Sequence, residues 1–238
     1  LLELIANQAA TAFENARLYA EQKAAADRRD VLYRITREVG ASIDRDQICQ
    51  AIDRSLRQVV KADFIAIALL TADRQEQEIL YLRVEDTLGQ KVLRPAHAGF
   101  LGHVIATGQS YLRNRGVLEL LREHQATIYT TGGAHKRAED NEEPIEALLA
   151  VPIKLGTTCI GAITLQSSAT DQPYSEADRE WLEAVASQAA TAFENANLYQ
   201  AQRESAERRA RLYAGSQAIS ASIDREQVCL AVHHTLGA

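Results

Sequence analysis

The sequence predicts an α+β domain carried on long helices, and two observations indicate this fold class. The middle third of the chain holds short β-rich runs, Phe64–Leu70 and residues 78–84, joined by the polar stretch DRQEQ as in a hairpin. The stretch that begins at Ser175 instead has helical spacing and contains no Pro or Gly before Gly215. We therefore expect an antiparallel sheet followed by one helix of some forty residues.

The closing helix is predicted to begin at Ser175, because this N-cap residue precedes Glu176 and Asp178 in the first turn. At about 1.5 Å per residue it spans roughly 60 Å, longer than one domain needs, so we expect its second half to project outward. Written as heptads, its small and apolar residues form a thin seam typical of a parallel dimeric coiled coil. The predicted dimer-interface residues are Val185, Ala189, Ala192, Ala196, Tyr199, Ala206 and Tyr213. The alternative is an exposed linker helix with charge pairs between neighbouring turns.

A repeat organises the chain. The nonapeptide QAATAFENA occurs at 8–16 and again at 188–196, and at this offset 29 of 58 aligned pairs between 1–58 and 181–238 are identical without a gap. Such a match predicts tandem units in a longer polypeptide, and we expect both ends of this chain to lie inside it. The expected parts are the end of a preceding closing helix with its linker (1–25), one complete domain (26–199), and a linker helix that starts the next unit (200–238).

The remaining elements follow from local signals. The charged stretch between Tyr19 and Tyr33 predicts a solvated joint between units, and Asp44 is expected to cap a helix over about 45–60, since Gln47 follows in capping-box spacing. Pro152 is tolerable in a strand only near an edge or a bulge. The other expected elements are short helices over 99–108 and 117–124, a strand over 109–113, and a strand pair over 147–154 and 158–167.

Three stretches, in this order, resemble the GAF domain family over roughly residues 26–199. GFLGHVIATGQSYLRN at 99–114 is similar to the family's glycine-spaced segment, which a strand follows. ALLAVPIKLGTTCIGAITLQSS at 147–168 resembles its strand pair with a Val-Pro step, and 174–199 resembles its closing helix. A PAS-like sensor is the alternative fold, but it would not normally place this hairpin directly before a long terminal helix.

The resemblance implies a six-stranded antiparallel sheet, related to those of profilin and PAS domains, with the first, second and last helices on one face. Members of the family use a pocket on the other face for cyclic nucleotides, bilins, haem or other small molecules, and many bind nothing known. The resemblance therefore names no cofactor. The residues expected to bind a ligand there are Phe100, His103, Tyr111, Asn114, Leu118, Leu121 and Tyr129. His103 can hydrogen-bond a ligand or respond to pH, and the alternative is a partly exposed helix histidine.

Several of the family's ligands are disfavoured by the residues present. Cys159 falls in an expected strand and Cys49 in a helix on the far face, so neither suits bilin attachment, and we expect Cys159 to be a small buried hydrophobe. Residues 131–140 lack the Asn-Lys-Phe-Asp-type motif of cyclic-nucleotide binders. Two cysteines per repeat on different elements do not supply the set that a GAF-type methionine sulfoxide reductase needs. The histidines at 97, 103, 124 and 135 have no ligand spacing, so no metal is expected.

Composition narrows the partners. A net charge of -6 argues against nucleic acid, and the longest apolar run, Phe64–Leu70, is too short to cross a bilayer, so we expect no membrane contact by this segment. Cysteines without disulfide or metal spacing fit a reducing compartment, and hence the cytoplasm. No nucleophile, base and orienting group form a set, so we expect no enzyme.

The expected function is that of a sensory module. It binds a small molecule or a partner and relays a conformational change through its helices to neighbouring GAF repeats and an output domain. The family resemblance suggests a bacterial two-component protein with a histidine kinase or cyclase output. The alternative is a ligand-free spacer or dimerisation repeat, whose pocket is filled by its own side chains.

Overall fold

The computed structural model of the chain describes residues 44–129, 135–141, 144–168 and 174–236, together with 8, 11–19, 22–23 and 26. The chain divides into two compact units, Leu1–Glu194 and Asn195–Ala238. The domain boundaries expected at 25/26 and 199/200 stay predictions, and most of the charged joint over 19–33 lies outside the described residues. No described helix has the length and apolar character of a membrane span.

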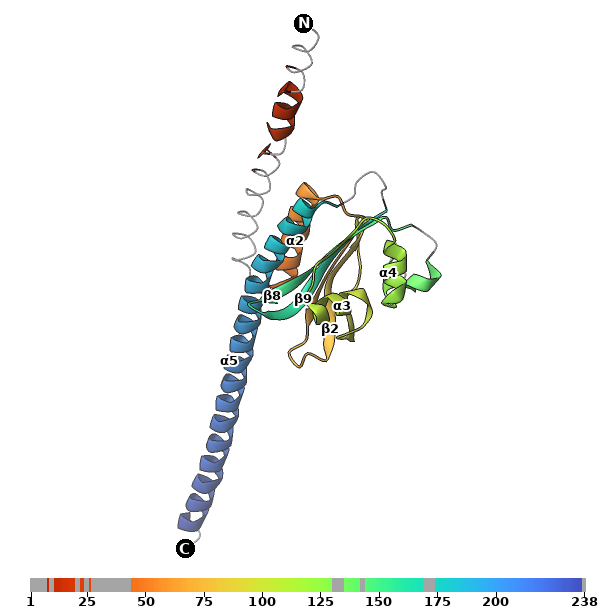
Figure 1. The fold of residues 1–238 in the computed structure, drawn as a ribbon. Coiled ribbons are helices and arrows are strands. Elements are labelled where there is room, and N and C mark those ends of the chain that lie inside the picture. Colours follow the sequence, from red (N-terminus) through yellow and green to blue (C-terminus); the bar gives the residue numbers. More distant parts are fainter. Residues whose placement is uncertain are drawn as a thin grey trace. The chain divides into compact units, whose positions relative to one another are not determined.

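An antiparallel sheet of seven strands forms the centre of the larger unit (Figure 1). Along the sheet the strands follow the path β3-β2-β1-β9-β8-β5, and β4 also pairs with β2. The expected six-strand path is therefore present, with β4 as a seventh strand that pairs with the opposite end of β2 from β3. The strands are β1 (Phe64–Leu70), β2 (Glu76–Val84), β3 (Thr87–Leu88), β4 (Val92–Pro95), β5 (Tyr111–Arg113), β8 (Ala147–Leu155) and β9 (Thr158–Ser167).

Both predicted strand pairs are confirmed. β1 pairs with β2 and β8 pairs with β9, each in antiparallel register. Pro152 lies in β8, but β5 pairs only with Leu148–Ala150 of that strand, so Pro152 has no described strand on its β5 side. The register also shifts between Ile153 and Lys154, next to the proline. Pro152 thus occupies an edge position beside a bulge, where a missing N–H costs no ladder bond.

One face of the sheet is covered by α2 (Arg45–Val59) and the first turns of α5 (Glu176–Leu236), as Figure 1 shows. Asp44 caps α2 as predicted, since its side chain accepts hydrogen bonds from the backbone N–H groups of Asp46 and Gln47. Apolar residues four apart put one stripe of α2 against the core. The buried side chains of these two helices include Ile48, Ile52, Leu56, Trp181, Leu182, Val185, Ala189 and Phe193.

A buried ion pair also joins α2 to the sheet. Arg83 Nε on β2 donates to Asp53 Oδ1 of α2 at 2.8 Å, and the two side chains are 5% and 6% exposed. The hydroxyl of Tyr81 donates to Asp53 Oδ2 at 2.9 Å. Burial, and then the negative charge of Asp53, raise the pKa of the Tyr81 phenol. Because Asp53 is the buried anion opposite Arg83, removing Asp53 leaves the Arg83 charge buried and uncompensated.

The opposite face is covered by two short helices and a ribbon (Figure 1). These are α3 (Gly99–Thr107), α4 (Val117–Glu123), β6 (Thr127–Tyr129), β7 (His135–Arg137) and the 3-10 turn Ala138–Asp140. Both helices agree with the predicted ranges, whereas a polar loop was expected where β6 pairs with β7. Phe100, Val104 and Leu121 from the helices pack in one core cluster with Leu148 and Ala162 of the sheet.

Candidate ligand-binding site

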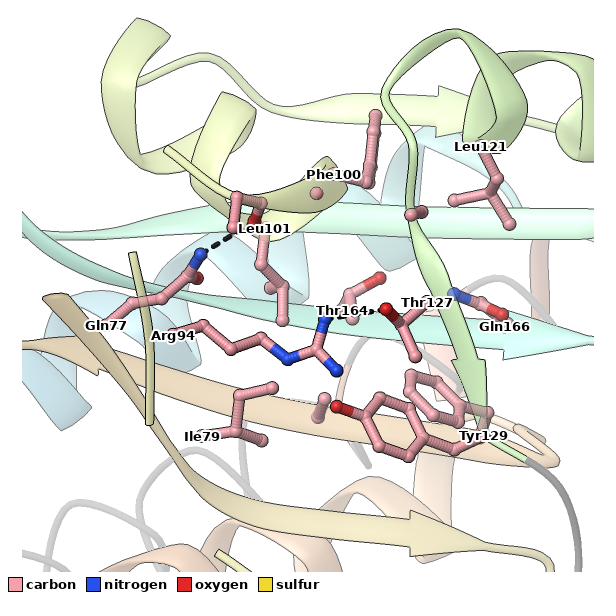
Figure 2. A pocket seen from close by; sticks show the side chains of 15 residues that line it. Gln77, Ile79, Arg94, Phe100, Leu101, Leu121, Thr127, Tyr129, Thr164 and Gln166 are labelled. Atoms are coloured by element: carbon pink, nitrogen blue, oxygen red, sulfur yellow. Dashed lines mark hydrogen bonds between the residues drawn. The ribbon is translucent and has the colours of Figure 1, made fainter. Parts of the chain in front are cut away.

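A cavity lies between the sheet and the covering elements α3 and β6 (Figure 2). Its volume is about 40 Å³, room for a few water-sized groups. Fifteen residues line it, from β1, β2, β4, α3, α4, β6 and β9 and from the turns that precede α3 and β6. The polar ones are Gln77, Arg94, Thr127, Tyr129, Thr164 and Gln166.

Two glycines fix the position of α3 over the cavity. Gly99 begins the helix with φ +67°, a left-handed conformation that favours glycine. A Cβ on Gly102 would collide with the backbone of Ala96 and His97, so only glycine permits this close approach. The first residues of α3 consequently line the cavity, and no side chain caps that end of the helix. The first-turn N–H groups of a helix have no acceptor inside the helix.

Arg94 on β4 supplies the positive charge of the site. Its side chain extends across the cavity toward β6, where Nη1 donates to Thr127 Oγ1 at 2.6 Å (Figure 2). The guanidinium carbon lies 5.7 Å from the centroid of the Tyr129 ring, within the range of a cation–π contact. Nε of Arg94 is buried and has no hydrogen-bond partner among the described residues. Both neighbouring side chains are neutral, so they do not balance the charge.

Gln77 and Thr164 present polar atoms to the same cavity. Gln77 on β2 is 1% exposed, and its Nε2 donates to Pro95 O at 3.1 Å and to Ala98 O at 2.7 Å. Thr164 on β9 is 3% exposed. Within the described part of the chain, neither Gln77 Oε1 nor Thr164 Oγ1 has a hydrogen-bond partner. A buried polar atom without a hydrogen-bond partner lowers the stability of the folded protein. Such atoms are therefore normally hydrogen-bonded to water or to a ligand.

Tyr129 forms the β6 side of the site. Its ring stacks on Phe64 of β1, with centroids 6.2 Å apart and planes inclined by 20°. Burial raises the pKa of the Tyr129 phenol, while the charge of Arg94 opposes this shift. A phenol that stays protonated at neutral pH can donate to a ligand oxygen.

A second depression of about 310 Å³ shares Phe64, Tyr129 and Gln166 with the first. Asp63 and Glu85 line it, so its charge is opposite to that of the cavity beside Arg94. Burial acts to raise the pKa of Asp63, but hydrogen bonds from Ser168 and Ser167 outweigh it and lower the pKa. A carboxylate held ionised in this way suits a cationic group or water rather than an anion.

Three of the seven residues predicted to bind a ligand line the cavity, namely Phe100, Leu121 and Tyr129. The other four, His103, Tyr111, Asn114 and Leu118, line neither depression. Leu118 packs at the edge of the apolar cluster beneath the helices. Sequence reasoning therefore did not distinguish residues that line the cavity from those that pack around it, and ligand binding by any of the seven stays a prediction.

His103 and Tyr111 belong to an aromatic cluster outside the cavity. His103 Nε2 lies 2.6 Å from Tyr111 Oη, and its ring centroid is 4.0 Å from that of His124. Burial, and then the charge of His103, lower the pKa of His124. Phe100 contacts all three rings and therefore links this cluster to the cavity wall.

Asn114 holds two segments together. Its Nδ2 donates to Tyr174 O at 2.8 Å, and its Oδ1 accepts from Tyr174 N at 3.0 Å. Asn114 directly follows β5, and Tyr174 stands two residues before α5. This reciprocal pair of hydrogen bonds ties the Asn114 amide to the backbone just before α5, so the side chain helps to position the start of that helix.

Sequence reasoning missed Arg94, Gln77 and Thr164. Arg94 lies on a four-residue strand that was not predicted, and Gln77 falls in the charged stretch that was assigned to the hairpin turn. Thr164 carried a weak signal, because Thr164 and Gln166 alternate with Ile163 and Leu165 in an otherwise apolar strand. That alternation places both polar side chains on the cavity face.

The residues predicted for a dimer interface divide into two groups. Val185, Ala189, Ala192 and Ala196 are buried within the chain itself, so they are not available to a partner in this structure. We therefore remove these four from the predicted interface. Tyr199, Ala206 and Tyr213 are exposed, and for them the dimer interface stays a prediction.

The described cysteines, Cys49 and Cys159, are both free thiols. Burial raises the pKa of the Cys49 thiol to about 12. Burial also raises the pKa of Cys159, whose Sγ donates to Gly161 O at 3.2 Å. Neither thiol is activated as a nucleophile. In the part of the chain that is described, no three His, Cys, Asp or Glu side chains gather as metal ligands do.

The sheet, its covering helices and the cavity define a GAF-type domain. The GAF domain family model matches residues 44–193, more than half of the 238-residue chain, so the chain belongs to the GAF domain family. No match was found among curated protein sequences.

Solved structures show the same fold at low sequence identity. One is a methyl-accepting chemotaxis protein (residues 122 to 287), with a TM-score of 0.55 and 17% identity over 70% of this chain and 99% of that one. Another is the GAF domain of a phosphoenolpyruvate-protein phosphotransferase from Coxiella burnetii, with a TM-score of 0.54 and 16% identity over 74% and 98% of the two chains. A free methionine-R-sulfoxide reductase from Neisseria meningitidis, in complex with its substrate, has a TM-score of 0.53 and 18% identity over 74% and 93%.

Proposed function

We propose that this chain is a non-catalytic sensory module of a larger cytoplasmic signalling protein. It binds a small polar molecule in the cavity beneath α3 and passes a conformational change along α5 to an output domain. The observation that carries the proposal is the cavity itself, where buried polar atoms of Gln77, Arg94 and Thr164 have no partner among the described residues. The methyl-accepting chemotaxis protein segment of the same fold supports a signalling role.

Strand β9 offers a short route from the cavity to α5. It pairs with β1 on one side and β8 on the other, in the middle of the sheet. Thr164 faces the cavity, and its neighbours Ile163 and Leu165, both fully buried, face the α2 and α5 side. The same strand thus contacts the cavity with one face and the α2 and α5 side with the other. A shift of β9 on ligand binding therefore moves the side chains that pack against the buried turns of α5. A ligand biases the helix only if it binds one arrangement more tightly than the other.

The hydrogen bonds between Asn114 and Tyr174 provide a second connection. They join the segment between β5 and α4 to Tyr174, two residues before α5. Tyr174 is buried, so movement of one segment displaces the other. The start of α5 thus depends on both the sheet and the covering layer.

Native mass spectrometry of protein purified from cells tests ligand binding. We expect a small molecule to be released on denaturation of the wild-type chain. Ala98→Leu, which fills the cavity from its wall, is expected to release none while keeping the Trp181 fluorescence of the folded domain. Equal release from both proteins would place the molecule elsewhere. The sensory proposal fails if no molecule is released and no metabolite in a thermal-shift screen raises the midpoint temperature of unfolding. That result would favour the spacer function.

A structural role as a dimerisation spacer is the second candidate. The observation in its favour is the exposed stripe of Tyr199, Ala206 and Tyr213, seven residues apart on α5. Such a heptad stripe suits a parallel helix pair between two copies of the chain. The same unit, repeated in tandem along the parent protein, would form a dimer along its linker helices.

Sedimentation equilibrium separates these alternatives. Tyr199→Glu with Tyr213→Glu is expected to weaken self-association at least tenfold, since like charges then meet across the seam. Ala201→Glu lies on the opposite side of the helix and serves as the control. A wild-type chain that stays monomeric at high concentration would contradict the predicted dimer.

A further inference from the structure

The cavity beneath α3 has an unbalanced charge. Among its fifteen lining residues Arg94 is the only charged one, and none is Asp or Glu. The guanidinium contacts the hydroxyl of Thr127 and the side chain of Tyr129, and both of these neighbours are neutral. A partly buried cation with neutral neighbours is stabilised by an anion that takes the place of lost water.

The end of α3 adds to this preference for negative charge. Ala98, Gly99 and Phe100, at the start of the helix, line the cavity, and no side chain caps them. An uncapped helix N-terminus carries partial positive charge and unpaired N–H groups, which suit an anion. A helix N-terminus alone does not define a binding site. Here, however, the start of α3 lines the same cavity as the buried Nε of Arg94, which lacks an acceptor among the described residues.

Gln77 sets a second requirement. Its Nε2 is engaged by the carbonyls of Pro95 and Ala98, which fixes Oε1 as the atom without a described partner. A carbonyl oxygen only accepts hydrogen bonds, so whatever meets it must bring an O–H or N–H group. Thr164 Oγ1, equally buried, can donate or accept. A bare carboxylate satisfies Arg94 but not Gln77, and a neutral amide satisfies Gln77 but leaves the charge of Arg94 unmatched.

We infer that the ligand of this cavity is a small organic anion that also carries a hydrogen-bond donor, such as a short hydroxy acid. The inference rests on the proposed sensory function and names the class of molecule sensed. The volume of about 40 Å³ agrees with a ligand of few atoms, because drug-sized ligands need roughly 300 Å³ or more. Arg94 binds the carboxylate, Thr127 holds the guanidinium in place, and Gln77 accepts from the hydroxyl.

Titration calorimetry of the whole chain with three matched probes tests the inference at constant ionic strength. Glycolate has both features, acetate has the charge alone, and acetamide has the donor without the charge. We expect glycolate to bind at least tenfold more tightly than either of the others. Arg94→Gln is expected to lower glycolate affinity at least tenfold, and Arg94→Lys, which keeps the charge, less than that. Gln77→Leu is expected to reduce the preference for glycolate over acetate toward unity.

Arg113→Ala, an exposed arginine on β5 outside the cavity, is the matched control and should leave all three affinities unchanged. Trp181 fluorescence verifies that each variant is folded. Acetamide binding as tightly as glycolate, or glycolate affinity that ignores Arg94→Gln, overturns the inference. A neutral or cationic molecule released from the purified protein also overturns it, yet leaves the sensory function standing. Absence of any released molecule and of any binding removes both.

Discussion

Two stretches of this chain have the same nine residues, QAATAFENA, and opposite environments. In the second copy Phe193 is fully buried, and Ala189 and Ala192 lie in the same core. In the first copy Phe13 is 79% exposed, and every described side chain over 11–19 is exposed. Both copies are helical where they are described. The local sequence therefore specifies the helix, while burial depends on whether a sheet lies beneath it.

The exposed first copy bears on the tandem units that the sequence predicts, which stay a prediction. A helix that carries the side chains of a closing helix, with its phenylalanine exposed, has the residues needed to cover another GAF sheet. Tandem repetition predicts that the first copy covers a preceding GAF unit, as the buried turns of α5 that hold Ala189 and Phe193 cover this sheet.

Alanine at the two phenylalanines should give the largest contrast. Phe193→Ala is expected to destabilise the domain by roughly 3–5 kcal/mol, since it removes a fully buried ring, whereas Phe13→Ala should change stability by less than about 0.5 kcal/mol. Urea unfolding followed by Trp181 fluorescence measures the domain alone, because this is the single tryptophan of the chain and it is buried. Equal effects of the two substitutions would contradict the assignment of one copy to the core.

The ion pair of α2 gives the next contrast, because the residue aligned with Asp53 in the second copy is His233. Asp53→Ala is expected to cost roughly 3–5 kcal/mol, since Arg83 is left buried without its anion. Asp53→His should lose a comparable amount. Asp86→Ala, which removes a 92% exposed carboxylate paired with Arg57, should cost less than about 1 kcal/mol in the same urea experiment. A stable Asp53→Ala protein would show that this pair does not hold α2 to the sheet.

A smaller difference is expected at the motif ASIDR, present at 41–45 and 221–225. Asp44 is an N-cap with φ -114° and ψ 122°, whereas Asp224 lies inside α5. Asp44→Ala should cost about 1 kcal/mol, while Asp224→Ala should be neutral or slightly favourable to helix formation. Thermal unfolding by circular dichroism checks both. A loss at Asp224 as large as at Asp44 would indicate a cap in the second copy as well.

The smallest predicted effect is on pH dependence. The pKa of His124 is lower in the folded domain than its ordinary value of 6.5 in the unfolded chain. As the pH falls below 6.5, the unfolded chain therefore takes up this proton first, which favours unfolding. Stability from this residue is therefore present above pH 6.5 and is lost as pH falls through the lowered folded pKa. His124→Gln should flatten the decline between neutral pH and pH 5. A variant whose unfolding free energy keeps the full wild-type pH slope would assign that slope to other groups.

Most of the fold follows from the sequence, because its long elements carry strong local signals. The cap at Asp44, the apolar runs of the two strand pairs and the glycines at 99 and 108 place α2, α3 and the central strands within a few residues. The two- to four-residue strands β3, β4, β6 and β7 were not predicted. Strands this short have no periodicity of their own and form only because a neighbouring strand pairs with them.

The site was less predictable for a related reason. Arg94 and Thr164 face a cavity, but in the sequence a polar residue that faces a cavity is indistinguishable from one that faces water. The heptad stripe of α5 was ambiguous in the same way. Val185 and Ala192 continue the register of Tyr199 and Tyr213, yet they cover the domain's own core. A helical stripe shows that something covers it and does not show what.

Amide hydrogen exchange of the whole chain, with and without saturating glycolate, tests most directly whether the cavity communicates with α5. The account predicts slower exchange on binding in β9 and α3, and a change that continues in α5 beyond Glu194. Arg94→Gln at the same glycolate concentration should show neither effect. Protection confined to the cavity walls, with α5 beyond Glu194 exchanging at its original rate, would contradict a sensory relay.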